Sequence, residues 1–160
     1  MQPELIICEQ SGQWAAAWRR AARGSRWDIP LREARSLDAC RQVLADARAG
    51  FVLVELTGDN AVGVLEFQDR LGCEYPAVRA AVLAQRGNEA YEPLARELGA
   101  IHFIDSPRRL APLVDAVGRY LASQPLPEES LRQQIWRRLP WKSAATASTG
   151  THLGENWHGR

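Results

Sequence analysis

The sequence predicts an α/β protein of three layers, in which helices cover both faces of a five-stranded parallel sheet. Short apolar runs alternate along the chain with longer segments whose apolar residues recur at helical spacing. Residues 51–55 (FVLVE) begin with four consecutive hydrophobic side chains, as in a strand that is buried on both faces. Strands that alternate with helices form parallel sheets. Five such strands suit the doubly wound order 2-1-3-4-5.

The first unit of the chain is a strand followed by a helix. Residues 4–8 (ELIIC) are apolar and partly β-branched, which predicts a buried strand. Residues 13–23 place Trp14 and Trp18 on one apolar helix face, so both indoles are expected in the core. Ser11 is expected to cap this helix, because its hydroxyl can accept a hydrogen bond from a free N–H of the first turn.

The second and third strands enclose another helix. Residues 31–35 are only weakly apolar, which indicates a strand at the edge of the sheet. Ser36 is expected to cap the helix that follows, and Gly50 is expected to end it. Residues 51–55 then form the central strand, which closes on Glu55.

The second half of the chain repeats this alternation. A helix is expected over residues 62–71, with Val62 as a candidate for its core face. Residues 78–84 predict the fourth strand. Asn88 is expected to cap the next helix, which Gly99 ends. The last two expected elements are a strand over residues 101–104 and an amphipathic helix over residues 109–122.

Composition indicates one globular domain of ordinary size with an appendage. The chain has 160 residues, of which 46% are hydrophobic and 24% charged. Its formal charge of +1 gives no general attraction to nucleic acid, and no nucleic-acid partner is expected. The three cysteines lack metal-ligand spacing, so buried thiols and no metal site are predicted. Without a signal-peptide pattern or an apolar run near the ~20 residues that cross a bilayer, a cytoplasmic protein is expected.

The composition changes after Ser123, and this change sets the expected domain organisation. A Trp-containing segment there, with Trp136 and Trp141 beside several arginines, is expected to pack back on the domain. Docking to a partner or dimer mate is an alternative, as is attachment to a membrane surface. The expected parts are an α/β domain over 1–123, a linker over 124–127, a short amphipathic helix over 128–141 and a disordered tail over 142–160.

Polar side chains follow the first and third predicted strands at the point where each strand ends. Glu9 and Gln10 come after the first strand, and Glu55 ends the third. In the order 2-1-3-4-5 these two strands flank the switch point, where open α/β sheets bind their ligands. The three side chains are therefore expected to converge.

This pattern resembles the receiver domain of bacterial response regulators, the CheY-like family, over residues 3 to 123. In that family an acidic pair after the first strand holds Mg²⁺, and an Asp that ends the third strand accepts a phosphoryl group. A Ser or Thr ends the fourth strand, and Lys-Pro ends the fifth. The matching positions are Glu9 and Gln10 for the acidic pair, Glu55 for the acceptor, Ala84 for Ser/Thr, Ser106-Pro107 for Lys-Pro, Phe103 for the aromatic switch residue and Gly63 for a glycine of the third helix.

The chemical positions depart from the family pattern. Glu55 moves the acceptor oxygen by a methylene group, and Gln10 offers Mg²⁺ a neutral ligand. Ala84 cannot hydrogen-bond a phosphoryl oxygen, and Ser106 lacks the positive charge of lysine. We therefore expect a degenerate pseudo-receiver that is not phosphorylated, is not an enzyme and needs no cofactor or metal. It would act as a protein-interaction module in bacterial signalling or regulation.

Several alternatives stay open. Glu55 would either mimic a phosphorylated Asp permanently or be a solvated remnant at the strand end. Asp59 would be the acceptor in an atypical response regulator of the two-component or phosphorelay type. A small ligand-binding protein of flavodoxin-like fold would instead hold its ligand near Glu9 and Glu55.

The expected partner is an unidentified protein, with a homodimer as an alternative and a membrane not favoured. The resemblance implies a contact face on the fourth and fifth strands and the helices that follow them. The candidate contact residues are Tyr91, Arg96, Arg108, Trp136 and Trp141.

Overall fold

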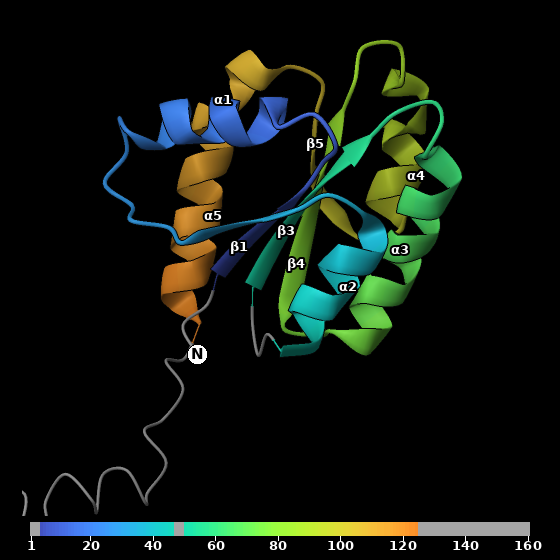
Figure 1. Cartoon of the computed structure of the whole chain (residues 1–160), viewed down its shortest axis with the longest axis horizontal. Helices are drawn as coiled ribbons and strands as arrows, with labels where there is room; N and C mark the ends of the chain where they lie inside the picture. The colour runs from blue at the N-terminus through green and yellow to red at the C-terminus, as the bar shows by residue number, and fades with distance from the viewer. Residues whose placement is uncertain (1–3, 47–49, 125–160) are drawn as a thin grey trace, which may run out of the picture. The chain divides into compact units, whose positions relative to one another are not determined.

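Five parallel strands form one sheet in the order β2-β1-β3-β4-β5, as the sequence predicts (Figure 1). The computed structural model describes residues 4–46 and 50–124. The strands are β1 (Glu4–Cys8), β2 (Leu31–Ala34), β3 (Gly50–Leu56), β4 (Val78–Ala84) and β5 (Ala100–Ile104). The helices are α1 (Gln13–Ala22), α2 (Leu37–Asp46), α3 (Ala61–Glu74), α4 (Glu92–Glu97) and α5 (Ala111–Ser123), with short 3-10 turns η1 (Glu89–Tyr91) and η2 (Pro107–Arg109).

The sheet separates two hydrophobic cores. Helices α1 and α5 cover one face, while α2, α3 and α4 cover the other (Figure 1). Alternate residues of β3 enter each core: Phe51 and Leu53 face α1 and α5, and Val52 and Val54 face the opposite layer. All seven residues of β3 are consequently buried. This explains why the strand reads as a continuous hydrophobic run.

The two outer strands differ from the inner ones. The edge position predicted for β2 is confirmed, and this strand is only four residues long. The register of β5 against β4 shifts, because Ala80 is opposite Ala100 whereas Ala81 is opposite His102. Ile101 is thus the extra residue of a bulge in β5, and it is exposed.

The tryptophans of α1 are buried, as predicted, with 2% of Trp14 and 1% of Trp18 exposed. A third tryptophan, Trp27, lies in the connection to β2 and packs on α5. Its indole N–H donates to Asp115 Oδ1 at 3.0 Å. A Cβ atom built on Gly118 would lie 2.3 Å from the Trp27 ring, so this contact requires a residue without a side chain.

Two of the residues predicted at helix ends, Ser36 and Gly99, take the expected positions, and Asn88 does not. Ser36 caps α2 as expected, because its Oγ accepts from the Ala39 N–H at 3.1 Å. Gly99 follows α4 with a φ of +98°, the left-handed conformation that favours glycine. The Asn88 prediction is wrong. Its side-chain amide donates to the Gln85 carbonyl at 3.0 Å, and the chain makes the η1 turn before α4 begins.

The core position considered for Val62 is also wrong. Helix α3 begins at Ala61, one residue earlier than predicted, and Ala61 and Val64 enter the core. Val62 lies on the outer side of this first turn, where 71% of it is exposed.

The predicted linker, amphipathic helix and tail lie largely outside the described residues, as do Trp136 and Trp141. By its internal contacts the chain divides into two units, Met1–Leu126 and Pro127–Arg160. No helix within the described ranges is long and apolar enough to span a bilayer.

Candidate functional site

The carboxyl ends of β1 and β3 bring two acidic side chains to one edge of the sheet. Cys8 of β1 is opposite Val54 of β3, so Glu9 and Glu55 follow at adjacent positions. Both line a pocket of about 390 Å³. Only 2% of Glu9 and 3% of Glu55 is exposed, so each carboxylate needs hydrogen bonds from the protein.

Glu55 obtains its hydrogen bonds from both neighbouring strands. Its Oε2 accepts from the backbone N–H of Gln10 at 3.1 Å, and its Oε1 accepts from the side-chain amide of Gln85 at 3.0 Å. The interpretation of Glu55 as a solvated remnant is therefore wrong. Gln10 also lines the pocket, but it contacts Glu55 through its backbone N–H and not, as expected, through its side chain.

Glu9 turns toward α1. Its Oε2 accepts from the Trp14 N–H at 2.8 Å, and its Oε1 accepts from the Ala15 N–H at 2.7 Å. A carboxylate here satisfies two buried N–H groups and complements the positive end of the helix dipole. Ser11 is not the N-cap residue, which is Gly12, but the hydrogen bond expected of it does form. Its Oγ accepts from the Gln13 N–H at 3.2 Å, and its hydroxyl donates to Glu9 Oε2 at 3.5 Å.

The side chain that approaches Glu55 from β4 belongs to Gln85, and this corrects the position given to Ala84. Ala84 is fully buried and is opposite Leu56 in the register. Leu83 is opposite Glu55, and side chains two residues apart share a face of the strand. Gln85 therefore points the same way as Glu55. The alternation of side chains along a strand would have identified Gln85 from the sequence, but only if the register of β4 against β3 had been known.

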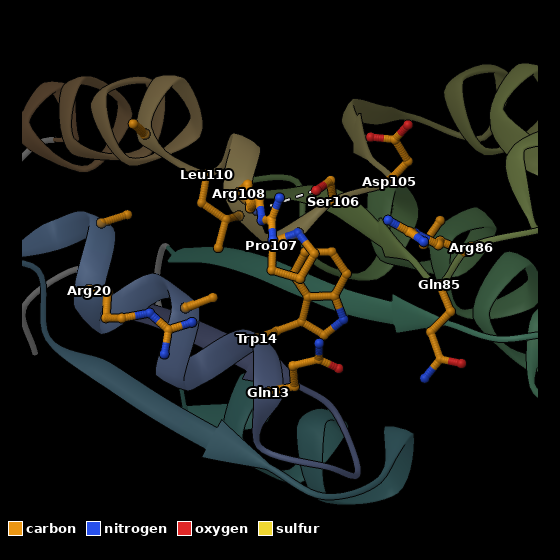
Figure 2. Close-up of a pocket in the computed structure, with 14 residues that line it drawn as sticks. Gln13, Trp14, Arg20, Gln85, Arg86, Asp105, Ser106, Pro107, Arg108 and Leu110 are labelled. Carbon is orange, nitrogen blue, oxygen red and sulfur yellow. Dashed lines mark hydrogen bonds between the residues drawn. The ribbon is translucent and has the colours of Figure 1, made fainter.

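Ser106 lies in a different hollow, of about 950 Å³, between α1 and the segment that joins β5 to α5 (Figure 2). Its Oγ accepts from the Arg108 N–H at 3.4 Å and so caps η2. Ala84 borders the same hollow, which the pocket of Glu9 and Glu55 does not include. The five residues matched to a phosphorylation pocket thus divide between two hollows.

Arg35 and Cys8 also line the pocket of Glu9 and Glu55, and Cys8 lies close to the thiol of Cys40. Arg35 binds both the Gln10 carbonyl, at 3.4 Å, and Glu33, at 2.7 Å. Cys8 and Cys40 are both buried, as the sequence predicts, and their thiols are close enough to share a hydrogen bond. This hydrogen bond lowers the pKa of Cys8 and raises the pKa of Cys40, with burial adding to the rise at Cys40. Cys73 is exposed, which contradicts the prediction that all three are buried.

The chain is similar to several solved structures. No family model matches the chain, and no curated protein does. A response regulator from Thermotoga maritima matches with a TM-score of 0.64 at 20% identity, covering 77% of this chain and 100% of that one. An orphan response regulator of H. pylori matches with a TM-score of 0.59 at 17% identity, over 74% and 96% of the two chains. A CheY-like protein, TadZ, from Pseudomonas aeruginosa matches with a TM-score of 0.60 at 16% identity, covering 74% of this chain and 99% of that one.

The chain has the receiver fold. Within this fold Phe103 lies on β5, half-buried, and packs against the core beneath α2, α3 and α4. At these identities the likeness shows the fold alone, so the roles of individual residues rest on the geometry described above.

Three of the five candidate contact residues lie in the described part of the chain, and their surroundings differ. Tyr91 packs partly against the core, and Arg96 forms an ion pair with Glu92 at 2.8 Å. Arg108 is exposed and lines the hollow beside α1. Trp136 and Trp141 lie outside the described residues.

Proposed function

We propose that this chain is a receiver-like protein-interaction module of bacterial signalling or regulation that does not accept a phosphoryl group. The observation that carries the proposal is the state of Glu55. Both carboxylate oxygens already accept hydrogen bonds, from Gln10 and Gln85, and only 3% of the residue is exposed. An acceptor must present a free oxygen in line with the incoming phosphorus, and misplacement by about 1 Å can cost on the order of a hundredfold in rate.

The residues at this edge do not suit Mg²⁺ either. Mg²⁺ requires oxygen ligands in octahedral geometry, commonly including carboxylates. The two oxygens of Glu9 are engaged by amides of α1, and Gln10 has a neutral side chain. We therefore assign no metal-dependent step and no enzymatic activity to the site.

The hydrogen bond from Gln85 to Glu55 supports a single fixed arrangement of this edge. It joins the ends of β3 and β4, and Asn60 adds a second link by donating to the Glu55 carbonyl at 3.0 Å. A receiver-like module built in this way presents its surface without a modification step. Asp59, the alternative acceptor, is exposed in the loop before α3 and outside the buried pocket.

Incubation with acetyl phosphate and Mg²⁺ is expected to leave the mass of the intact protein unchanged, because Glu55 is buried and both of its oxygens are held by hydrogen bonds. Intact-protein mass spectrometry checks this. The triple variant Q10D/E55D/S106K restores family residue types at three positions and serves as the positive comparison. A phosphoryl adduct on the unmodified sequence would contradict the proposal, and loss of that adduct in D59N would assign it to Asp59.

The interaction role predicts a specific protein partner. The full chain, immobilised and exposed to lysate of its native host, is expected to retain the same protein in the presence and absence of acetyl phosphate. Quantitative mass spectrometry of the retained proteins measures this. Retention that appears only after acetyl phosphate treatment would indicate a phosphorylation-dependent regulator instead.

A further inference from the structure

A cluster of arginines lies at the carboxyl edge of the sheet, outside the pocket of Glu55. The hollow of about 950 Å³ between α1, the end of β4 and the segment from Asp105 to Ala111 is here called the arginine cleft (Figure 2). Arg20 reaches it from α1, Arg86 from the loop after β4, and Arg108 from η2. Three segments that are distant in sequence therefore contribute one cation each.

The charge of the arginine cleft is not balanced from within. All three arginines are exposed, and no acidic side chain in residues 4–46 or 50–124 forms an ion pair with them. Asp105 is the one acidic residue that lines the cleft, and it pairs with Arg109 at 3.6 Å. Guanidinium groups bind carboxylates through two parallel hydrogen bonds, so three unpaired ones favour an anionic ligand.

The start of α5 adds to this positive potential. The helix is 13 residues long, and no side chain caps its N-terminus, where Ala111 borders the cleft. The positive end of the helix dipole therefore faces the same space as the arginines. Helix α1 differs, because Glu9 neutralises its N-terminus from the other side.

The arrangement of the three guanidinium groups favours an extended ligand over a single phosphate. In Figure 2, Arg20 and Arg86 stand on opposite sides of Trp14, with Arg108 between them, so they do not converge on one point. Pro107 and Ala111 supply the accessible apolar surface between the charges, while Trp14 and Leu110 lie buried beneath it. A peptide can place successive carboxylates along such a cleft and rest its backbone and methylene groups on the apolar part.

We propose that the arginine cleft binds an acidic peptide segment of a partner protein. The inference rests on the proposed function, because it supplies the chemistry of the partner that an interaction module needs. Association depends on charge, and raising the salt concentration weakens it. Glu55 does not line the arginine cleft, although its hydrogen-bond donor Gln85 does.

The test is a titration of the ¹⁵N-labelled full chain with a short poly-glutamate peptide, followed by NMR. Saturable, salt-sensitive shifts are expected at the amides of Gln13, Arg86 and Ser106. The variant R20Q/R86Q/R108Q is expected to bind about tenfold more weakly or worse. The matched control R23Q/R70Q/R119Q removes the same charge from exposed positions outside the cleft and is expected to bind nearly as well as the original protein.

Equal weakening in both triple variants would overturn the proposal, because the peptide would then respond only to total charge. Shifts with inorganic phosphate but none with the peptide would also overturn it, in favour of a small-anion site. Different results would refute the proposed function and the peptide-binding role of the arginine cleft. Peptide binding together with phosphorylation by acetyl phosphate would refute the proposed function alone. A partner retained equally by R20Q/R86Q/R108Q would refute this inference alone.

Discussion

Replacement of Glu9 by alanine is expected to lower the free energy of unfolding by about 2–4 kcal/mol. The variant leaves the N–H groups of Trp14 and Ala15 without their acceptors, and both hydrogen bonds are buried. An unsatisfied buried donor costs about 1–3 kcal/mol, and the charge at the helix N-terminus is lost as well. Urea unfolding followed by far-UV circular dichroism measures the change.

Two further variants separate the carboxylate from the rest of the turn. Glu9→Gln keeps one acceptor oxygen but places an NH₂ group against a helix N–H. Its stability should therefore fall between that of the original protein and that of Glu9→Ala. Ser11→Ala removes a hydroxyl that accepts from the exposed Gln13 N–H at 3.2 Å and donates only at 3.5 Å to Glu9, so it should cost less than about 1 kcal/mol. A loss in Ser11→Ala equal to that in Glu9→Ala would show that Glu9 does not hold the start of α1.

Gly118→Ala is expected to destabilise the protein by about 1–3 kcal/mol, although alanine is the better helix former. The added Cβ would lie 2.3 Å from the ring of Trp27. The indole must therefore leave its place against α5 and lose the hydrogen bond to Asp115. Urea unfolding again gives the change in stability.

Gly72 provides the matched control on α3, because a Cβ there would meet no atom within 4 Å. Gly72→Ala should stabilise the protein by about 0.5–1 kcal/mol, the ordinary gain from replacing a glycine inside a helix. A double-mutant cycle with Trp27→Ala tests the cause, since Gly118→Ala should become nearly harmless once the ring is gone. Stabilisation by Gly118→Ala in the original background would contradict the close packing.

The fold could be predicted because its signals are local. The continuous hydrophobic run of β3 indicates a strand buried on both faces, and the weakly apolar run of β2 indicates an exposed one. The degree of burial then indicates which strand lies in the centre of the sheet and which lies at its edge. The bounds of β4 agree with the prediction at both ends, residues 78 and 84. The core face of α3 could also have been predicted, because Ala61, Val64, Gln68 and Leu71 recur at intervals of three and four residues and Val62 falls outside this series.

The candidate site was predicted in its location but not in its contacts. Glu9 and Glu55 do lie at the carboxyl edge. The direction of Glu9 depends on the turn at Gly12, whose φ of +79° starts α1 close enough for its amides to reach the carboxylate. The contact from Gln85 depends on the register of β4 against β3. Neither the turn nor the register is encoded in a short stretch of sequence. The sequence alone therefore suggested that Glu9 takes the position of a metal ligand and that Ala84, not Gln85, approaches Glu55.

The bulge at Ile101 bears on how two copies of this chain can associate. An extra residue interrupts the regular spacing of N–H and C=O groups along β5, and this discourages another strand from adding there. At the opposite border, β2 offers only four residues, with Arg32 exposed among them. Growth of the sheet from molecule to molecule is therefore disfavoured at both borders. Among the described residues, this leaves the helices and loops as the surfaces available for association between two copies.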